Sequence, residues 1–457
     1  MGGCDDYQVT DHAAATPATT GTPTAQDTAQ DEVAALCRDL IRIDTTNPGD
    51  NSGPGERAAA EHVAAILAGA GLEPRILESD PTRASVVARW EGTDPARPAL
   101  LIHGHLDVVP ANAADWQVHP FSGEIKDGCV WGRGAVDMKD MDAMILAAVR
   151  ELVRSGERPP RDLVVALLAD EEAGGDHGAT WIVHERPDLI EGVGEAISEV
   201  GGFSTTIAGQ RAYLLQTAEK GIRWLRLVAH GRAGHGSQVN DDNAVTRLCE
   251  AVARVGTHSW PLQITPTVRA FLAGVEELTG VRLDPEDPDA LVQTLGTTAR
   301  FVGATLRTTT NPTVLDGGYK HNVIPGEASA LIDCRFLPGG EEHLVETVRQ
   351  LAGTGVEVQT VHEGVSLEWP FEGDLVDAMV AALQAEDPEG VVLPYCLSGG
   401  TDNKNFSEAG IVGYGFAPLR LPPELDFSGM FHGVDERVPV DSLRFGVRTL
   451  SRFLRTC

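Results

Sequence analysis

The chain has few basic residues for its length and no long apolar run. Its 457 residues include 36 Lys and Arg against 67 Asp and Glu, which gives a formal net charge of −31 at pH 7. Because phosphate backbones and anionic lipids are bound by clustered Lys and Arg, nucleic acid and membrane surfaces are disfavoured as partners. No apolar stretch is long enough to span a bilayer. The acidity itself keeps a protein surface hydrated, and we draw no function from it.

Cysteine is also scarce, and its spacing matches no metal or disulfide motif. The seven cysteines include no CxxC pair, which fits inert thiols in a reducing compartment and predicts a cytoplasmic location. The start of the chain lacks the basic segment and following apolar stretch of a secretory signal. Residues 1–30 are rich in Ala, Thr, Pro, Gln and Asp, so we expect a disordered tail there.

The length of the chain predicts two or three domains, and the pattern of its first folded part predicts an α/β domain. Near-continuous apolar runs at 98–109 and 161–172 are typical of strands that are covered on both faces. Between them, residues 141–156 have the apolar spacing of an amphipathic helix. Strand, helix, strand in this order predicts a mostly parallel sheet with helices on both faces.

The pattern changes near residue 216. Strands are expected at 220–231, 301–310, 327–337 and 356–361, and helices at 242–255 and 341–353. This βαββαβ order predicts a smaller ferredoxin-like α+β domain, with a helical insertion at about 257–300. We therefore expect the α/β domain in two parts, 31–215 and 363–457, interrupted by the smaller domain at 216–362.

His105 and Asp107 follow the first buried strand and form an HxD pair. Side chains two residues apart share one face of a strand, and ligands bind at the carboxyl ends of such strands. A neutral His can ligate zinc while a nearby carboxylate fixes its tautomer. Alone, the pair fits a satisfied His–Asp contact in a protein core better than a metal site.

Asp170, Glu171 and Glu172 end the second buried strand. Three successive carboxylates repel one another and resist desolvation. A bound divalent cation would stabilise their charged forms, although a solvated turn would also tolerate them.

Three further acidic or His residues lie at loops in the α/β parts of the chain. Asp137 in GRGAVDMK precedes a helix, where it could equally cap that helix. Glu199 follows a short apolar strand in AISEVGG, and His432 lies in the Gly-flanked loop MFHGVDE. A purely structural role would be unusual for a His in such a loop.

Taken in order, GHLDVVP, GRGAVDMK, DEE, SEVGG and FHGVDE resemble the motifs of the di-zinc aminoacylase–carboxypeptidase family. That family includes acetylornithine deacetylase, succinyl-diaminopimelate desuccinylase, carnosinase-like dipeptidases and carboxypeptidase S. The resemblance runs from about residue 31 to the C-terminus. It implies a zinc-dependent hydrolase that cleaves the amide bond of a small peptide or N-acyl amino acid next to a free carboxylate.

The resemblance also implies a ligand set for two zinc ions. His105 and Glu199 would bind one ion, Glu172 and His432 would bind the other, and Asp137 would bridge both. Cobalt or manganese could occupy the same ligands.

Two catalytic roles follow from the same resemblance. Asp107 would orient His105, and Glu171 would be the general base. Two metals can share a hydroxide, and zinc can lower the pKa of bound water to about 7. Glu171 would take a proton from this water and pass one to the leaving amine.

The family resemblance marks three more positions outside the metal ligands, and Gly400 is a fourth candidate because glycine permits the close approach of a substrate. His235 in AGHGS matches the lid histidine that stabilises the oxyanion, in many members on the partner subunit, which implies a homodimer through the lid domain. Asn322 in HNVIPG and Arg335 in DCRFLPG match the family's substrate-binding pair, and Gly400 lies in a loop that could meet the substrate. Without the family, each would be read as an ordinary turn or surface residue.

The segment SGGTDNKNF at 398–406 and the long lid insertion resemble the carboxypeptidase S branch most. The desuccinylase branch usually has Ser before the Asp, where this chain has Thr401. Alternatives are a desuccinylase-like or acetylornithine deacetylase-like biosynthetic deacylase, and a metal-binding interaction module without catalysis. The presence of every expected ligand and of Glu171 argues against the last of these.

Overall fold

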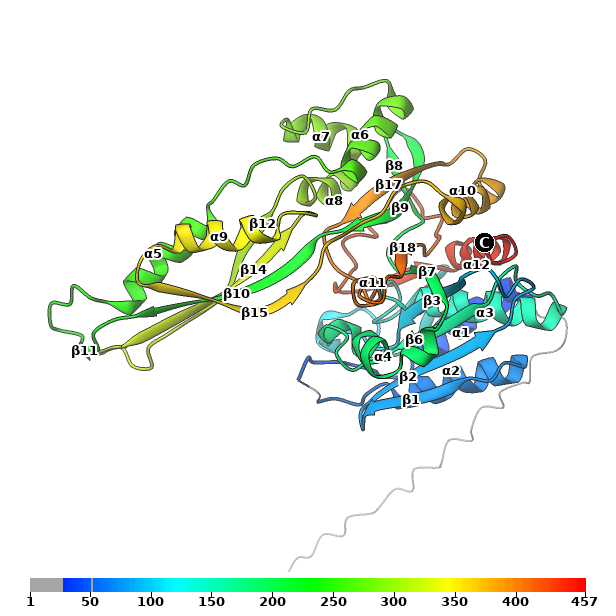
Figure 1. Ribbon diagram of the computed structural model, residues 1–457, viewed down its shortest axis with the longest axis horizontal. Coiled ribbons are helices and arrows are strands. Elements are labelled where there is room, and N and C mark those ends of the chain that lie inside the picture. Colours follow the sequence, from blue (N-terminus) through cyan, green and yellow to red (C-terminus); the bar gives the residue numbers. More distant parts are fainter. Residues whose placement is uncertain (1–27, 51) are drawn as a thin grey trace, which may run out of the picture.

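The computed structural model describes residues 28–50 and 52–457, which form a large and a small sheet with their helices (Figure 1). Most of the expected tail at 1–30 lies outside the described residues. The first helix, α1 (Ala29–Ile41), begins inside that range, and the Thr28 hydroxyl and backbone amide both donate to the Asp31 carboxylate at its start. None of the helices in the described ranges is long and apolar enough to cross a membrane.

The large sheet confirms the predicted α/β class. Its main path runs β1 (Arg75–Asp80), β2 (Arg83–Trp90), β6 (Leu163–Leu168), β3 (Ala99–His105), β7 (Val193–Ser198), β18 (Val412–Gly415), β9 (Gln210–Glu219) and β16 (Leu367–Glu368). β17 (Val391–Leu397) and β8 (Phe203–Ile207) also pair with β9. The central strands β6, β3, β7 and β18 are parallel, and antiparallel strands lie outside them.

Helices cover both faces of this sheet. Alternate residues of β3 belong to different apolar cores, with Leu100 and Ile102 in one and Leu101 in the other. On one face α1 packs with α3 (Lys139–Ser155) and α12 (Val440–Leu454), and α2 (Arg57–Ala70) and α10 (Asp374–Glu386) complete the layer. α4 (Ala179–Glu185) and α11 (Asn403–Ser407) cover the other face. A separate short sheet joins β4 (Glu124–Lys126), β5 (Cys129–Trp131) and β19 (Arg437–Pro439).

The small sheet has the predicted ferredoxin-like arrangement. Its antiparallel strands lie in the order β12 (Thr309–Gly317), β14 (Glu327–Phe336), β10 (Gly221–His230) and β15 (Val356–Gly364). The helices α5 (Ala244–Gly256) and α9 (Glu341–Ala352) pack on one face of it. At the end far from the large sheet, β11 (Gly234–His235) pairs with β13 (Val323–Ile324) (Figure 1).

The prediction of a strand at 301–310 is wrong over most of that range. The chain forms α8 (Ala299–Ala304) there, and β12 begins only at Thr309. Val302 belongs to the apolar core that also contains Phe271 and Leu291, so residues 299–304 continue the helical insertion and do not join the small sheet. The β-branched residues at 308–310 gave the whole segment a strand-like composition.

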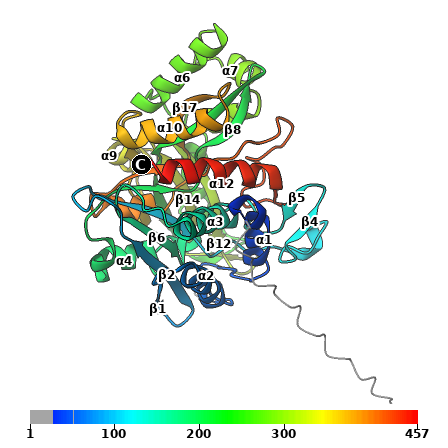
Figure 2. The ribbon, with the colours of Figure 1, turned by 90° about the vertical axis from the view of Figure 1, so that its right-hand side faces the viewer.

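The helical insertion packs on the large sheet and not on the small one. α6 (Pro266–Thr279), α7 (Pro288–Leu295) and α8 interrupt the small sheet in the sequence but lie over β8 and β17 of the large sheet (Figures 1 and 2). Val268, Phe271 and Val275 share one apolar core with Leu214 and Leu393. The segment 216–362 is therefore not a single packing unit.

Candidate active site

Adjacent parallel strands bring the predicted acidic and His residues to one edge of the large sheet. β6, β3 and β7 are neighbours in that order, and His105 of β3 pairs in register with Leu168 of β6. Glu171 and Glu172 follow β6, and Glu199 follows β7. The carboxyl ends of neighbouring parallel strands meet at one edge, which explains why these distant sequence segments converge.

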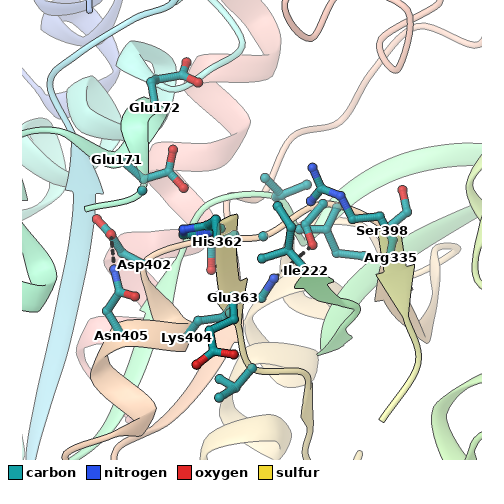
Figure 3. Close-up of a pocket in the computed structure, with 18 of the residues that line it drawn as sticks. Glu171, Glu172, Ile222, Arg335, His362, Glu363, Ser398, Asp402, Lys404 and Asn405 are labelled. Carbon is teal, nitrogen blue, oxygen red and sulfur yellow. Dashed lines mark hydrogen bonds between the residues drawn. The ribbon is translucent and has the colours of Figure 1, made fainter. Parts of the chain in front are cut away.

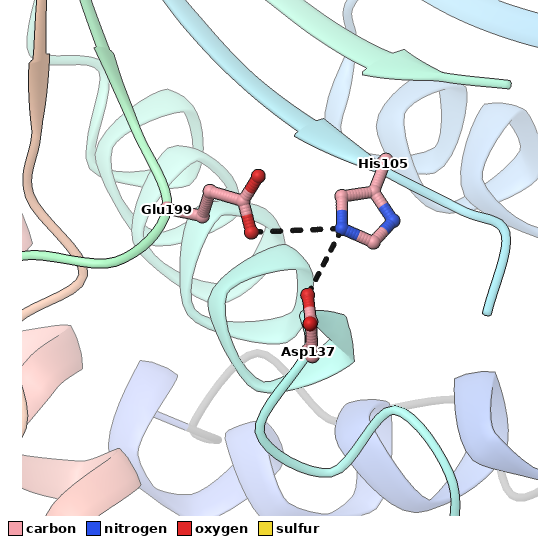
Figure 4. A group of neighbouring side chains, drawn as sticks. All are labelled: His105, Asp137 and Glu199. Atoms are coloured by element: carbon pink, nitrogen blue, oxygen red, sulfur yellow. Dashed lines mark hydrogen bonds and ion pairs between the residues drawn. The ribbon is translucent and has the colours of Figure 1, made fainter. Parts of the chain in front are cut away.

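One group of possible metal ligands contains His105, Asp137 and Glu199 (Figure 4). The His105 Nε2 atom lies 3.1 Å from Asp137 Oδ1 and 3.6 Å from Glu199 Oε2. His105 and Glu199 are buried. A second group contains Asp137, Glu172 and His432, with His432 Nε2 at 3.3 Å from Asp137 Oδ2 and 3.1 Å from Glu172 Oε2.

Asp137 belongs to both groups and turns a different oxygen toward each. Its Oδ1 faces His105 and its Oδ2 faces His432. In each group the ligand atoms lie within 4.8 Å of one another. Carboxylate oxygens and imidazole nitrogens in this mixture suit zinc and related divalent metals. The residues present therefore fit a pair of metal ions that share Asp137.

The protonation of these groups in the protein alone supports the same fit. Burial raises the pKa of Glu199 to about 8, and burial also raises the pKa of Glu172. Glu172 Oε1 is buried and has no hydrogen-bond partner among the described residues. Hydrogen bonds to Asp137 and Glu172 raise the pKa of His432 to about 10. A divalent cation bound between these groups would supply the positive charge that keeps Glu172 and Glu199 ionised and His432 neutral.

Asp107 lies beside His105 but makes its shortest contacts elsewhere. Its carboxylate is 3.6 Å from His105 Nδ1, whereas the backbone carbonyl of Asp107 lies 3.0 Å from that nitrogen. The carboxylate accepts hydrogen bonds from the backbone amides of Glu171 and Glu172 at 3.2 and 3.1 Å. The carbonyl is thus the closest acceptor for the ring, and the side chain holds the turn that carries both glutamates.

Glu171 lies beside the two groups of possible metal ligands and lines a large cavity. Its Oε2 is 4.0 Å from His105 Nε2, and its side chain lines the cavity beside Glu172 (Figure 3). Burial and the nearby Glu199 carboxylate raise the pKa of Glu171 well above its usual value. Left-handed backbone occurs at Asp170 with φ 70°, Val200 with φ 57° and His432 with φ 56°. Such backbone is uncommon for non-glycine residues and clusters at functional sites.

The cavity has a volume of about 930 Å³ and lies between the two ligand groups and the near end of the small sheet. Of the four further residues that the sequence marked, Arg335 of β14 and Gly400 after β17 line it. A Cβ on Gly400 would lie 2.5 Å from Lys404 Nζ, so a side chain at this loop position would displace the end of the Lys404 side chain. His235 and Asn322 lie instead at β11 and β13, at the far end of the small sheet (Figure 1).

Several lining residues gave no signal in the sequence. They come from β10, β15 and α11, and include Ile222, Trp224, His362 and Lys404. The Trp224 side chain is 41% exposed and its ring lies 4.9 Å from the His362 ring. These residues share the cavity with the possible metal ligands because the small sheet meets the large one at this edge, and no local pattern in the sequence encodes that contact.

Each cationic side chain of the cavity wall has a partner within the chain. The Arg335 guanidinium donates to both Asp333 oxygens at 2.7 and 3.2 Å. Arg223 forms an ion pair with Glu363. Lys404 Nζ donates to the backbone carbonyls of Lys220 and Gly399.

The fold and the paired ligand groups define a metallohydrolase of the α/β class. Residues 101–456 match the family described as Peptidase family M20/M25/M40, and the chain belongs to this family.

Among curated proteins, the chain is similar to aminoacylase-1 of Sus scrofa, at 28% identity over 419 residues, which covers 88% of this chain and 89% of that protein. It is also similar to probable carboxypeptidase S-like 2 of Dictyostelium discoideum, at 28% identity over 381 residues, 79% of this chain and 72% of that protein. Among solved structures, the M20 family metallo-carboxypeptidase Sso-CP2 from Sulfolobus solfataricus has a similar fold. Its TM-score is 0.72 at 18% identity, with 93% of this chain and 99% of that chain covered.

These relatives confirm the predicted family and place the chain among metal-dependent hydrolases of amide bonds. Both curated relatives are 28% identical to this chain, so they do not separate an aminoacylase from a carboxypeptidase. The branch within the family stays a prediction.

Proposed function

We propose that the chain hydrolyses a small N-acyl amino acid or dipeptide whose scissile amide lies next to a single free carboxylate. The observation that carries this proposal is a shared cavity wall, with Asp137, Glu171 and Glu172 on one side and Arg335 on the other. The similarity to an aminoacylase and to a carboxypeptidase S-like protein supports the same class of substrate.

The metal ions would be two zinc ions per chain, with cobalt or manganese as possible replacements. His105 and Glu199 would hold one ion, Glu172 and His432 the other, and Asp137 would contact both, because these residues form the two groups around Asp137. When bound, the ions supply charge for polarising the substrate carbonyl and for acidifying water.

Glu171 would be the general base and then the general acid. It lies next to a ligand of each group, and its side chain faces the cavity. It would take a proton from the attacking water and deliver a proton to the nitrogen of the leaving amine. The raised pKa of Glu171 suits a carboxylate that must hold a proton during the reaction.

The cavity wall supports a substrate with one carboxylate and an apolar group. Asp333 engages Nε and Nη2 of Arg335 and orients the guanidinium, which leaves Nη1 and the second Nη2 hydrogen to bind a carboxylate through two parallel hydrogen bonds. Ile222 and Trp224 add apolar surface to the same wall. A desuccinylase substrate carries several carboxylates and would need further cations, whereas Arg223 and Lys404 are already engaged.

A homodimer through the small sheet would place His235 in a partner's cavity. His235 is exposed at the far end of the sheet, away from its own cavity. The strand β12 pairs with β14 on one side only and exposes Val314 and Leu315, at 49% and 62%. Unpaired strand edges with apolar side chains favour association with a second chain. We further propose that Asn322, whose backbone carbonyl accepts a hydrogen bond from the amide of Gly236 beside His235, reaches the partner's substrate.

Two broader proposals concern the roles of the two sheets and the location of the protein in the cell. The large sheet, at about 31–215 and 363–457, would carry the chemistry, and the small sheet within 216–362 would supply Arg335 and the dimer contact. The described cysteines, Cys37, Cys129, Cys249, Cys334, Cys396 and Cys457, are all free. Free thiols support a cytoplasmic location.

The test is a panel of N-acyl amino acids and dipeptides assayed with zinc, with amine release as the readout, for the wild type and Glu171→Gln. We expect turnover of substrates with a free carboxylate, and a loss of roughly 10²- to 10⁴-fold in kcat for Glu171→Gln. Elemental analysis should show the same metal content in both proteins. Glu185→Gln, an exposed acid on α4, is the matched control. Unchanged turnover in Glu171→Gln, or no turnover across the wild-type panel, would contradict the proposal.

A further inference from the structure

A buried asparagine lies where the ends of β3 and β6 meet, behind the proposed metal ligands. Asn47 is in the loop after α1 and is 3% exposed. Its Nδ2 atom donates to Asp107 Oδ2 at 2.9 Å and to Asp170 Oδ1 at 3.1 Å. Since His105 and Leu168 pair in register, Asp107 and Asp170 occupy equivalent positions two residues beyond them. One amide therefore bridges the ends of two neighbouring strands.

The orientation of this amide is fixed from its other side. Asn47 Oδ1 accepts hydrogen bonds from Arg83 Nη2 at 2.8 Å and from the backbone amide of Gly49 at 3.0 Å. Arg83 is itself buried and paired with the buried Glu56 at 2.5 Å. An amide offers donors only at its nitrogen. Because donors already occupy Oδ1, the nitrogen must face Asp107 and Asp170.

Both bridged acids hold the turn that carries Glu171 and Glu172. Asp107 accepts the backbone amides of those two residues. Asp170 immediately precedes them, and its Oδ2 accepts the backbone amide of His177 at 3.0 Å. Without the amide of Asn47, the buried carboxylates of Asp107 and Asp170 would each lose one hydrogen-bond donor, which is costly in a desolvated setting.

We propose that Asn47 is a positioning residue for Glu171 and Glu172. It touches neither glutamate, and it acts by joining Asp107 to Asp170 so that the turn between them points one glutamate at the cavity and the next at His432. The inference rests on the proposed roles of Glu171 and Glu172. Asn47 does not line the cavity, and no motif that pointed to the function included it.

The test compares Asn47→Leu, which keeps the volume and removes the donor, with the wild type. We expect kcat to fall at least tenfold while KM stays within about threefold, because the base is displaced and the substrate contacts are not. Loss of zinc to a chelator, followed with a colorimetric dye and without substrate, should become at least tenfold faster because Glu172 is less well held. Asn243→Ala removes another asparagine, the N-cap of α5 on the small sheet, and should change neither readout.

A purely structural role for Asn47 would show a different pattern. A lower unfolding temperature with kcat, KM and zinc release unchanged would overturn the proposal. If Asn47→Leu does not fold, Asn47→Ser retains a shorter donor, and it should fall between wild type and complete loss in kcat and in zinc release. Wild-type values for Asn47→Ser in both readouts would equally overturn the proposal. Zinc release needs no substrate, so it tests Asn47 even if the substrate panel fails.

Discussion

Adjacent carboxylates at Glu171 and Glu172 have different surroundings. Glu172 Oε2 lies 3.1 Å from His432, while Glu171 lines the cavity and approaches His105 at 4.0 Å. Consecutive residues in a short turn point in different directions, so neighbouring acids can take separate roles. The backbone amides of both residues are held by Asp107, and the division therefore depends on hydrogen bonds behind the turn.

At the same scale, Arg335 should determine the preference for a free carboxylate. We expect Arg335→Ala to raise KM by roughly 10- to 100-fold for substrates with a free carboxylate, the cost of a hydrogen bond between charged groups. Carboxamide analogues should show little change. Steady-state kinetics on matched acid and amide substrates provides the measurement. Arg226→Ala, an exposed position on the same small sheet, is the control. Equal effects on acid and amide substrates would contradict the assignment.

The site was largely predictable from the sequence wherever a residue ends a strand. His105, Glu171 and Glu199 follow near-continuous apolar runs, and such runs predict buried parallel strands whose carboxyl ends meet. Trp224, Lys404 and Asn47 were not predictable, because their place depends on contacts between segments far apart in the chain. The direction of His235 away from its own cavity is likewise a property of the whole small sheet.

For helices and strands, the apolar patterns predicted where an element lies in the sequence better than they predicted which other element it packs against. The strand order of the small sheet follows from the βαββαβ sequence, as predicted. The insertion α6–α8 shows the limit, because an amphipathic helix records that one face is buried but not which sheet covers it.

The end of β3 also carries a histidine that should make stability depend on pH. Burial lowers the pKa of His103 to about 4, and its ring nitrogens contact Asn403 and Ser198. The pKa of a histidine in the unfolded chain is about 6.5, so between this pH and the pKa of about 4 in the folded chain, the unfolded chain binds more protons than the folded chain. Above pH 6.5 neutral His103 should therefore make its full contribution to the free energy of unfolding. This contribution should be lost as the pH falls toward 4.

His103→Gln removes this titration and provides the comparison. Urea unfolding of both proteins across pH 4–6.5 should give a shallower decline for the variant, by up to about 3 kcal/mol. Parallel curves for the two proteins would show that His103 is not the responsible group.

For the whole molecule, the separation of His235 from its own cavity has a direct consequence for mixed assemblies. His235→Ala and Glu171→Ala should each be weakly active alone. In a mixed dimer, one cavity combines an intact Glu171 with an intact His235 from the other chain. Random exchange of subunits should then restore about a quarter of wild-type activity, because half of the dimers are mixed and one cavity in each is complete.

Light scattering coupled to size-exclusion chromatography would establish the dimer, and tagged subunits would verify exchange. No recovery in verified mixed dimers, or a monomer in solution, would place His235 outside the reaction of a partner chain.

The packing of α6–α8 limits how this protein can be recombined with its relatives. The helices leave the small sheet between α5 and β12, yet Val268 and Phe271 share a core with Leu214 of the large sheet. A chimaera that exchanged the small sheet as one uninterrupted block would also replace α6–α8, and part of the large sheet would then lose the helices that pack on it. Successful exchange would need four junctions rather than two, with the helices retained by the recipient.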